Sequence, residues 1–232
     1  MRTIAVVAVV AFLSVPAFAS TYLDAYDDGI AILTATNITG SMSLTETSLT
    51  DVLGGERYST VTWESGTGAV NLNVSIVTAQ DVASYSSPSG LDGKFSFEYG
   101  RSTDLDTDIT SGGTDFAFKF LFDVADFTAP ITVTVTTRDG GGDKVSSGTV
   151  NSPSGLQTGD ADVWVTLPYS SFSTVANGGA DFTDIDNILV EIDGPSESDY
   201  TLKASVYDIP EPATMTVLAL GGIGVLLRRR RK

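Results

Sequence analysis

Three alternating aspartates, Asp104, Asp106 and Asp108, form the group of side chains best suited to chemistry. Calcium takes about six to eight oxygen ligands, and carboxylates at this spacing on a tight loop can converge on one ion. Asp115 stands where a helix–loop–helix calcium loop has its last ligand, but Ile109 replaces the glycine of that loop and the flanks read as strands. The four aspartates therefore predict either a calcium-binding loop of another kind or a solvated acidic loop.

Aromatic side chains are the second group, because an exposed ring can stack on a sugar. The candidates for ligand binding are Trp63, Trp164 and Tyr169. In a β-sandwich an aromatic residue is more often part of the core. Trp164 lies between Val163 and Val165, which point to the other side of an expected strand, so Trp164 is either core or platform.

Carboxylate pairs could hydrolyse glycosides by acid–base catalysis. Glu98 and Glu191 each alternate with apolar residues on an expected strand, but nothing in the sequence marks either one as a catalytic acid. We predict no catalytic residues. Other closely spaced aspartates are weaker metal candidates: Asp24, Asp27 and Asp28; Asp139 and Asp143; Asp184 and Asp186.

Composition excludes several functions. The 232 residues include no Cys and no His, which rules out disulfides, Cys–His zinc sites and Ser-His-Asp triads. Thirteen Lys and Arg against 29 Asp and Glu give a net charge of −16, which argues against nucleic-acid binding. Between residues 20 and 209, seven basic residues face 28 acidic ones, a net charge of −21 that suits solubility or counterion and calcium loading.

The elements that must position these residues are strands. Apolar and polar residues alternate with period two, as in strands that bury one face. Such runs are 58–63, 70–76, 95–99, 115–122, 131–136, 163–167, 188–192 and 200–207. Glycine-rich clusters separate the runs, and no long helical period occurs. We predict an all-β fold, an antiparallel, jelly-roll-like β-sandwich that forms one acidic domain over residues 20–209.

The C-terminal half of this domain adds a resemblance. Residues 163–168 lead to Tyr169-Ser-Ser-Phe172, then to an Ile-x-Val-x-Ile strand at 188–192, then to a closing strand that ends at 206–208. This order looks like the jelly-roll modules of the carbohydrate-binding or galactose-binding-like kind. The resemblance implies a sandwich with a sugar ligand.

The N-terminus reads as a secretory signal peptide over residues 1–19. Arg2 supplies the positive start, residues 4–15 are almost wholly apolar, and Ala17 and Ala19 form the small-x-small pattern before a cut after Ala19. The alternative is a buried N-terminal strand or helix.

The C-terminus, residues 210–232, reads as a sorting and anchor segment. Pro210, Glu211 and Pro212 precede an apolar stretch at about 213–227 and a basic tail at 228–232. As a helix the stretch spans about 22 Å against roughly 30 Å of bilayer core, so flanking residues or local thinning must make up the difference. We predict a single transmembrane helix there, with the basic tail on the cytoplasmic side and the domain outside.

This order of motif, apolar stretch and basic tail resembles the PEP-CTERM sorting domain, which usually has Val where this chain has Ile209. The resemblance implies an exported bacterial protein that an exosortase-type membrane enzyme recognises. The alternative is a plain stop-transfer anchor.

Together these features predict an exported, non-catalytic protein, anchored in the membrane at the cell surface or released to the extracellular matrix, that binds exopolysaccharide with calcium. Two alternatives stay open: a secreted glycan-active hydrolase, and a purely structural surface protein without a specific ligand. Convergent carboxylates in an aromatic-walled cleft would favour the hydrolase. A flat aromatic face beside a calcium site would favour the binder.

Overall fold

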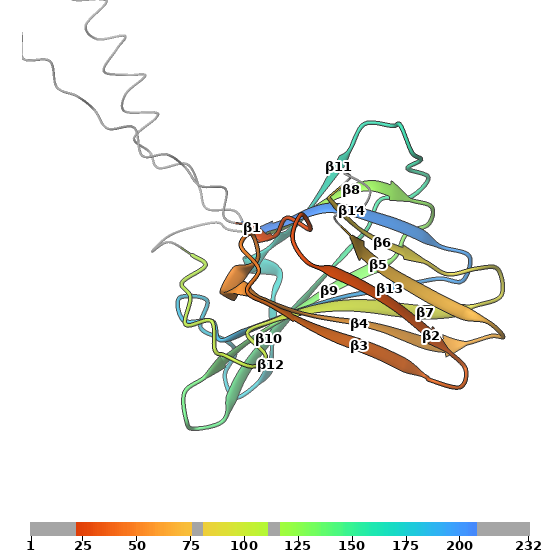
Figure 1. Ribbon diagram of the computed structural model, residues 1–232. Coiled ribbons are helices and arrows are strands. Elements are labelled where there is room, and N and C mark those ends of the chain that lie inside the picture. Colours follow the sequence, from red (N-terminus) through yellow and green to blue (C-terminus); the bar gives the residue numbers. More distant parts are fainter. Residues whose placement is uncertain (1–21, 76–80, 111–116, 208–232) are drawn as a thin grey trace, which may run out of the picture.

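The computed structural model describes residues 22–75, 81–110 and 117–207 of the chain. In this part, antiparallel strands pair into two sheets that pack face to face (Figure 1). Sheet A has the order β11-β8-β14-β6-β5-β2, and β1 pairs with the end of β14. Sheet B has the order β12-β10-β9-β13-β7-β4-β3. The predicted all-β antiparallel sandwich is confirmed.

The bounds of the strands are β1 Tyr22–Asp24, β2 Ile30–Thr36, β3 Ser41–Thr47, β4 Glu56–Ser65, β5 Ala69–Ser75, β6 Val82–Ser86, β7 Asp92–Tyr99, β8 Ala117–Ala125, β9 Pro130–Arg138, β10 Asp143–Asn151, β11 Val163–Pro168, β12 Ser173–Ala176, β13 Asn187–Gly194 and β14 Asp199–Tyr207. The described helices are the single turns η1 Leu53–Gly55 and η2 Tyr169–Ser171. Neither is long and apolar enough to cross a membrane.

The core lies between the sheets, and the period-two pattern fills it. On β7 and β8 every second side chain points inward, because successive residues of a strand face opposite sides. The inward aromatic side chains are fully buried: Phe95, Phe97 and Tyr99 of β7, and Phe118, Phe120 and Phe122 of β8. Burying one such side chain contributes about 1.5–3 kcal/mol, so these strands anchor the sandwich.

At each lateral edge of the sandwich, the edge strands of the two sheets are neighbours in the sequence. On one side the edge strands β2 and β3 follow each other through a tight turn, in which the Gly40 amide donates to the Thr36 carbonyl (2.8 Å). On the other side β11 and β12 are the edge strands, joined through η2. The outer faces of both sheets are left to present side chains to solvent.

The predicted signal peptide (1–19), the sorting segment (210–232) and its apolar stretch (213–227) lie outside the described residues. The described residues include nearly all of the predicted domain (20–209).

Candidate functional site

Trp164 lies on the outer face of sheet A. It pairs with Leu121 of β8, and the neighbours of Leu121 on either side, Phe120 and Phe122, are buried in the core. The register therefore turns Leu121 and Trp164 outward, and 49% of Trp164 is exposed. β11 is also the edge strand of sheet A, so no strand of the described residues lies beyond Trp164 on that side.

A three-membered ion cluster adjoins Trp164 on the same face. The Lys203 ammonium contacts Asp123 at 3.0 Å and Asp162 at 2.9 Å. Asp162 precedes Trp164 by two residues, and Asp123 follows Leu121 by two. Because residues two apart on a strand face the same side, both aspartates lie on the same face as Trp164 and Leu121 and next to them. The hydrogen bonds to Asp162 and Asp123 raise the pKa of Lys203. We call Trp164, Leu121, Asp123, Asp162 and Lys203 the Trp164 surface.

The other predicted aromatics do not join this surface. Trp63 lies on β4 of sheet B and packs against the core. Tyr169 belongs to η2 and packs its ring against Phe118 and Phe182, with ring centroids 5.1 and 4.9 Å away. The structure therefore separates Trp164 from Trp63 and Tyr169 and does not form one platform from the three.

The predicted calcium loop runs beside the segment that leads into β13. Thr107 and Ile185 exchange backbone hydrogen bonds of 3.1 and 2.9 Å, and the Leu105 amide donates to the Asp186 carbonyl at 3.0 Å. Gly100 turns the chain into this loop with φ 75°, and a Cβ on Gly100 would overlap the Asp186 carbonyl oxygen. Only glycine allows so close an approach.

This pairing brings Asp106 next to Asp184 and Asp186, with a carboxylate oxygen of each within 4.8 Å of the others. We call these three residues the Asp106 triad. Asp106 and Asp184 are exposed, whereas Asp186 is buried and accepts a hydrogen bond from the Arg138 amide. Asp106 itself has a positive φ of 46°, a conformation that aspartate tolerates better than most residues. The sequence offered Asp184 and Asp186 only as a separate, weaker pair.

The Asp106 triad has an excess of negative charge. Among the described residues, no Lys or Arg side chain forms an ion pair with a member of the triad. Loss of water and the charges of Asp186, Asp104 and Asp184 raise the pKa of Asp106. Such a group is stabilised either by a proton or by a bound cation.

The remaining members of the predicted loop turn elsewhere. Asp104 forms an ion pair with the Arg138 guanidinium. Asp108 accepts hydrogen bonds of 2.7 Å from both the amide and the hydroxyl of Thr110. Asp115 lies outside the described residues. Of the four predicted ligands, the triad thus holds Asp106.

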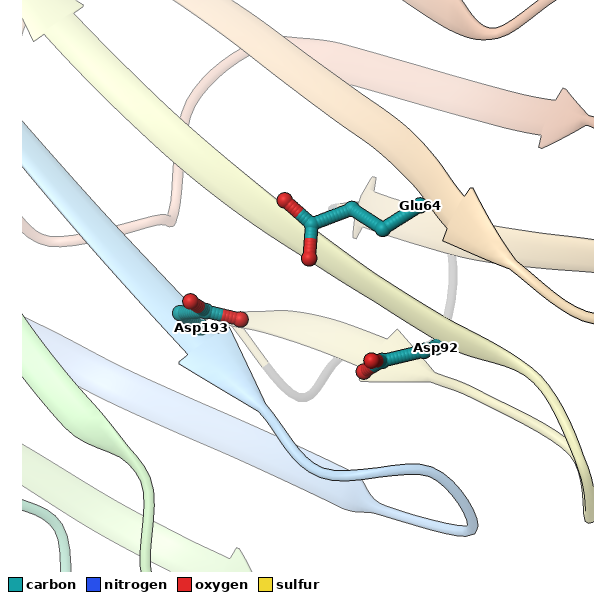
Figure 2. Close-up of side chains that lie close together, drawn as sticks. All are labelled: Glu64, Asp92 and Asp193. Atoms are coloured by element: carbon teal, nitrogen blue, oxygen red, sulfur yellow. The ribbon is translucent and has the colours of Figure 1, made fainter.

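A second group of carboxylates, which sequence reasoning missed, lies where β4 and β13 end and β7 begins. Figure 2 shows Glu64, Asp92 and Asp193 turned toward one another, again with oxygens within 4.8 Å. We call them the Glu64 triad. Lys94 lies beside them, with its ammonium 3.6 Å from Glu64 and 3.2 Å from Glu191. No sequence spacing links residues from three separate strands, so only the pairing of the strands could reveal this triad.

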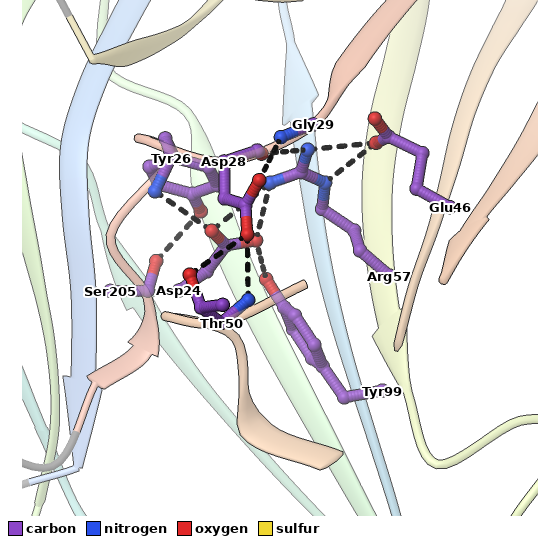
Figure 3. A network of polar contacts seen from close by, with 9 residues as sticks. All are labelled: Asp24, Tyr26, Asp28, Gly29, Glu46, Thr50, Arg57, Tyr99 and Ser205. Atoms are coloured by element: carbon purple, nitrogen blue, oxygen red, sulfur yellow. Dashed lines mark hydrogen bonds and ion pairs between the residues drawn. The ribbon is translucent and has the colours of Figure 1, made fainter. Parts of the chain in front are cut away.

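A third polar group is buried between the sheets. Arg57 of β4 is fully buried and contacts Asp24 of β1 at 3.0 Å and Glu46 of β3 at 2.7 Å (Figure 3). The Tyr99 hydroxyl donates to Asp24 at 3.1 Å, and Tyr26 and Ser205 bond through their hydroxyls at 2.8 Å. Because β1 belongs to sheet A and β3, β4 and β7 to sheet B, this Arg57 network ties the two sheets together.

Burial dominates the electrostatics of the Arg57 network. It raises the pKa of Asp24 to about 6, although Arg57, the Tyr26 amide and Tyr99 each favour the carboxylate. Asp28 beside the network behaves in the opposite way, since hydrogen bonds from the Thr50 amide and hydroxyl lower its pKa. The network is inaccessible to a large substrate, so we assign it to the stability of the fold.

Comparison with known proteins identifies the C-terminus. Residues 208–231 match the PEP-CTERM protein-sorting motif, so the predicted resemblance is confirmed. The motif indicates an exported protein that is anchored at the surface through its C-terminus. No curated protein sequence matches the chain.

Among solved structures the chain is similar to carbohydrate-binding modules. The family 11 module of the cellulosomal cellulase Lic26A-Cel5E from Clostridium thermocellum is 15% identical, with 82% of this chain and 94% of that chain covered and a TM-score of 0.40. The solution structure of CtCBM11 is also 15% identical, with 84% of this chain and 99% of that chain covered and a TM-score of 0.44. The module TmCBM61 bound to β-1,4-galactotriose is 10% identical, with 77% of this chain and 88% of that chain covered and a TM-score of 0.28. At this level of similarity they do not indicate which residues of this chain bind a ligand.

Proposed function

We propose that this exported protein is a non-catalytic binder of extracellular polysaccharide, with the Trp164 surface as its binding site. The observation that carries the proposal is the half-exposed indole of Trp164 on an edge strand, next to the fixed charges of Asp123, Asp162 and Lys203. The producing cell's own exopolysaccharide is the ligand we expect.

The chemistry of this surface suits a sugar chain. An indole presents a broad apolar face that stacks on the C–H groups of a pyranose ring. The paired carboxylates and the ammonium offer charge-assisted hydrogen bonds to hydroxyl groups, and their mutual ion pairs hold them in place before binding. An exposed surface accommodates a long polymer better than a closed pocket would.

Affinity electrophoresis of the full chain through gels that contain the cell's exopolysaccharide tests this proposal. Trp164→Ala should weaken retention about tenfold or more, because a central aromatic anchor typically contributes about 2 kcal/mol. Phe127→Ala is the matched control, since Phe127 is also about half exposed (47%) but lies outside the Trp164 surface. Equal retention of wild type and Trp164→Ala would refute the assignment.

We further propose that the Asp106 triad binds calcium and stiffens the loop at residues 101–110. Two oxygens that each lie about 2.4 Å from one ion are at most about 4.8 Å apart, a spacing that the triad satisfies. Carboxylate oxygens are the ligands that calcium prefers. The cation would replace the missing positive partner of Asp106, Asp184 and Asp186.

Thermal unfolding with and without calcium tests this second proposal. At a calcium concentration about 100-fold above Kd, the melting temperature should rise by roughly 5–10 °C. Asp106→Asn should abolish the rise. Asp108→Asn removes the same charge from the same loop but outside the triad, so it should leave the rise intact. An unchanged melting temperature of the wild type in millimolar calcium would contradict the proposal.

The motif also suggests the partner and the destination. We expect an exosortase-type membrane enzyme to process the C-terminus and so to release the protein to the extracellular matrix. The hydrolase alternative gains no support from the two glutamates considered for it, because Glu98 contacts Arg101 at 3.1 Å and Glu191 contacts Lys94 at 3.2 Å.

A further inference from the structure

Strand β3 is an open edge of sheet B. Its residues, Ser41–Thr47, pair with β4 in unbroken register, and no strand of the described residues pairs with its other side. Six of its seven side chains are exposed; the exception, Glu46, turns to Arg57. In Figure 1, β3 is the outermost strand on its side of the sandwich.

Natural edge strands are protected against pairing by charged residues, proline, bulges or short length. The edges on the opposite side follow this rule, since β12 has four residues with a register shift and β11 ends at Pro168. In contrast, β3 has no Lys, no Pro and no bulge, and its one charged residue, Glu46, already pairs with Arg57 inside the chain. Residues 29–45, which include β2 and most of β3, carry no charged side chain in a domain of net charge −21.

The backbone of β3 offers unused hydrogen-bonding groups to the open side. The Trp63 amide of β4 donates to the Gly40 carbonyl at 2.7 Å. Antiparallel hydrogen bonds recur at every second residue, so Met42, Leu44 and Glu46 direct their amides and carbonyls to β4. Ser43 and Thr45 therefore direct theirs away from the sheet.

We propose that β3 pairs with β3 of a second copy of this chain, antiparallel about a two-fold axis at Leu44. In this register Ser43 of one copy meets Thr45 of the other, and both have outward-facing backbone groups. Glu46 meets Met42, so no like charges face each other. Leu44 meets Leu44, and the side chains of Leu44 and Met42, 38% and 41% exposed in the single chain, become covered.

Charge favours a second copy at this edge. Residues 163–180, which include β11 and β12, are also uncharged, but those edges are protected by Pro168 and by the short, irregular β12. Two strongly acidic domains repel each other over most of their surfaces. The neutral stretch at residues 29–45 is a place where they can approach, and β2 extends it along the edge of sheet A. The two-fold axis also closes the assembly at two copies, because each β3 edge is used once.

Sedimentation of the full chain over a concentration series tests the proposal. The wild type should show twice the monomer mass and dissociate on dilution. Ser43→Asp adds a like charge at the edge, and Thr45→Pro removes an outward amide that β4 does not use, so both should leave a monomer. Thr149→Asp adds the same charge on the exposed face of the internal strand β10 and should stay dimeric. A wild-type monomer at all concentrations, or an oligomer unaffected by Ser43→Asp and Thr45→Pro, would overturn the proposal.

The register has its own test, because the chain has no native cysteine. Residue 44 of the two copies would form a non-hydrogen-bonded pair, whose Cα atoms lie about 4.5 Å apart, within disulfide range. Oxidised Leu44→Cys should run as a covalent dimer on a non-reducing gel, whereas Thr149→Cys should not. If Leu44→Cys stays monomeric under oxidation, the two-fold register is wrong.

Discussion

The Arg57 network and the Asp106 triad treat negative charge in opposite ways. In the interior, Arg57 contacts both Asp24 and Glu46, and hydroxyl and amide donors satisfy Asp24 further. At the surface, the exposed Asp106 and Asp184 lie beside the buried Asp186, and no Lys or Arg among the described residues forms an ion pair with any of the three. A buried charge must bring its partner within the chain, whereas an exposed group can leave that partner to the solvent.

The Glu64 triad is intermediate between the two, because it is a group of carboxylates outside the core that has a positive partner within the chain. As in the Asp106 triad, a carboxylate oxygen of each residue lies within 4.8 Å of the others, but Lys94 supplies a positive charge from the chain itself. Two similar groups of carboxylates should therefore respond differently to calcium, and the reason is one lysine. The following predictions test this comparison.

The largest effect is expected from Arg57→Met. The substitution leaves Asp24 and Glu46 without their cation, and removing one partner of a buried ion pair typically costs about 3–5 kcal/mol. Urea unfolding measures the free energy of unfolding. Lys94→Met is the control, because its ion pairs are partly exposed and such pairs contribute below about 1 kcal/mol. Equal losses in the two variants would remove the distinction between interior and surface.

The pH dependence of stability should be the next largest effect. Because the pKa of Asp24 is raised from 3.8 to about 6, its contribution is fully present below about pH 4 and is lost as pH rises through 6. The shift corresponds to about 3 kcal/mol. The raised pKa values of Asp106 and Asp193 act in the same direction, whereas the lowered pKa of Asp28 opposes it only in more acidic solution.

Unfolding should therefore be harder at pH 5 than at pH 7. Urea titrations across this range measure the slope, and Asp24→Asn should flatten it even if the variant is less stable at every pH. A stability that rises steadily from pH 5 to 7 would show that Arg57 holds Asp24 ionised and that the raised pKa is wrong.

The smallest effect is expected from Lys94→Gln. The direct loss of stability should stay below about 1 kcal/mol. The informative result is a new calcium response, because the Glu64 triad then lacks its own cation and should add to the rise in melting temperature. Lys144→Gln is the control, since Lys144 pairs with Asp139 outside both triads. If the two variants respond to calcium alike, Lys94 does not explain the difference between the triads.

The strands could be predicted from the sequence because residues buried in the core recur at every second position. Phe118, Phe120 and Phe122 recur at every second position, and a strand is the conformation that places all three in one core. The contacts of Asp106 could not be predicted. Asp184 and Asp186 follow it by more than 70 residues, and they meet because Thr107 pairs with Ile185.

The aromatic residues show the same limit. Trp63 and Trp164 both lie on strands with alternating neighbours, and the sequence left each as either core or platform. The pairing of β11 with β8 turns Trp164 to solvent, while Trp63 packs against the core. Asp123, Asp162 and Lys203 carried no signal at all, because they come together only when β8, β11 and β14 lie side by side.

The sequence by itself determined the sorting motif at the C-terminus and the alternation that makes an all-β sandwich. Both are local, since a linear motif and a strand face depend on neighbouring residues. The tertiary structure decided which carboxylates share a site, which aromatic residue meets solvent and which edge is open. These depend on strand order and register, and they arise only when residues distant in the chain pack against each other.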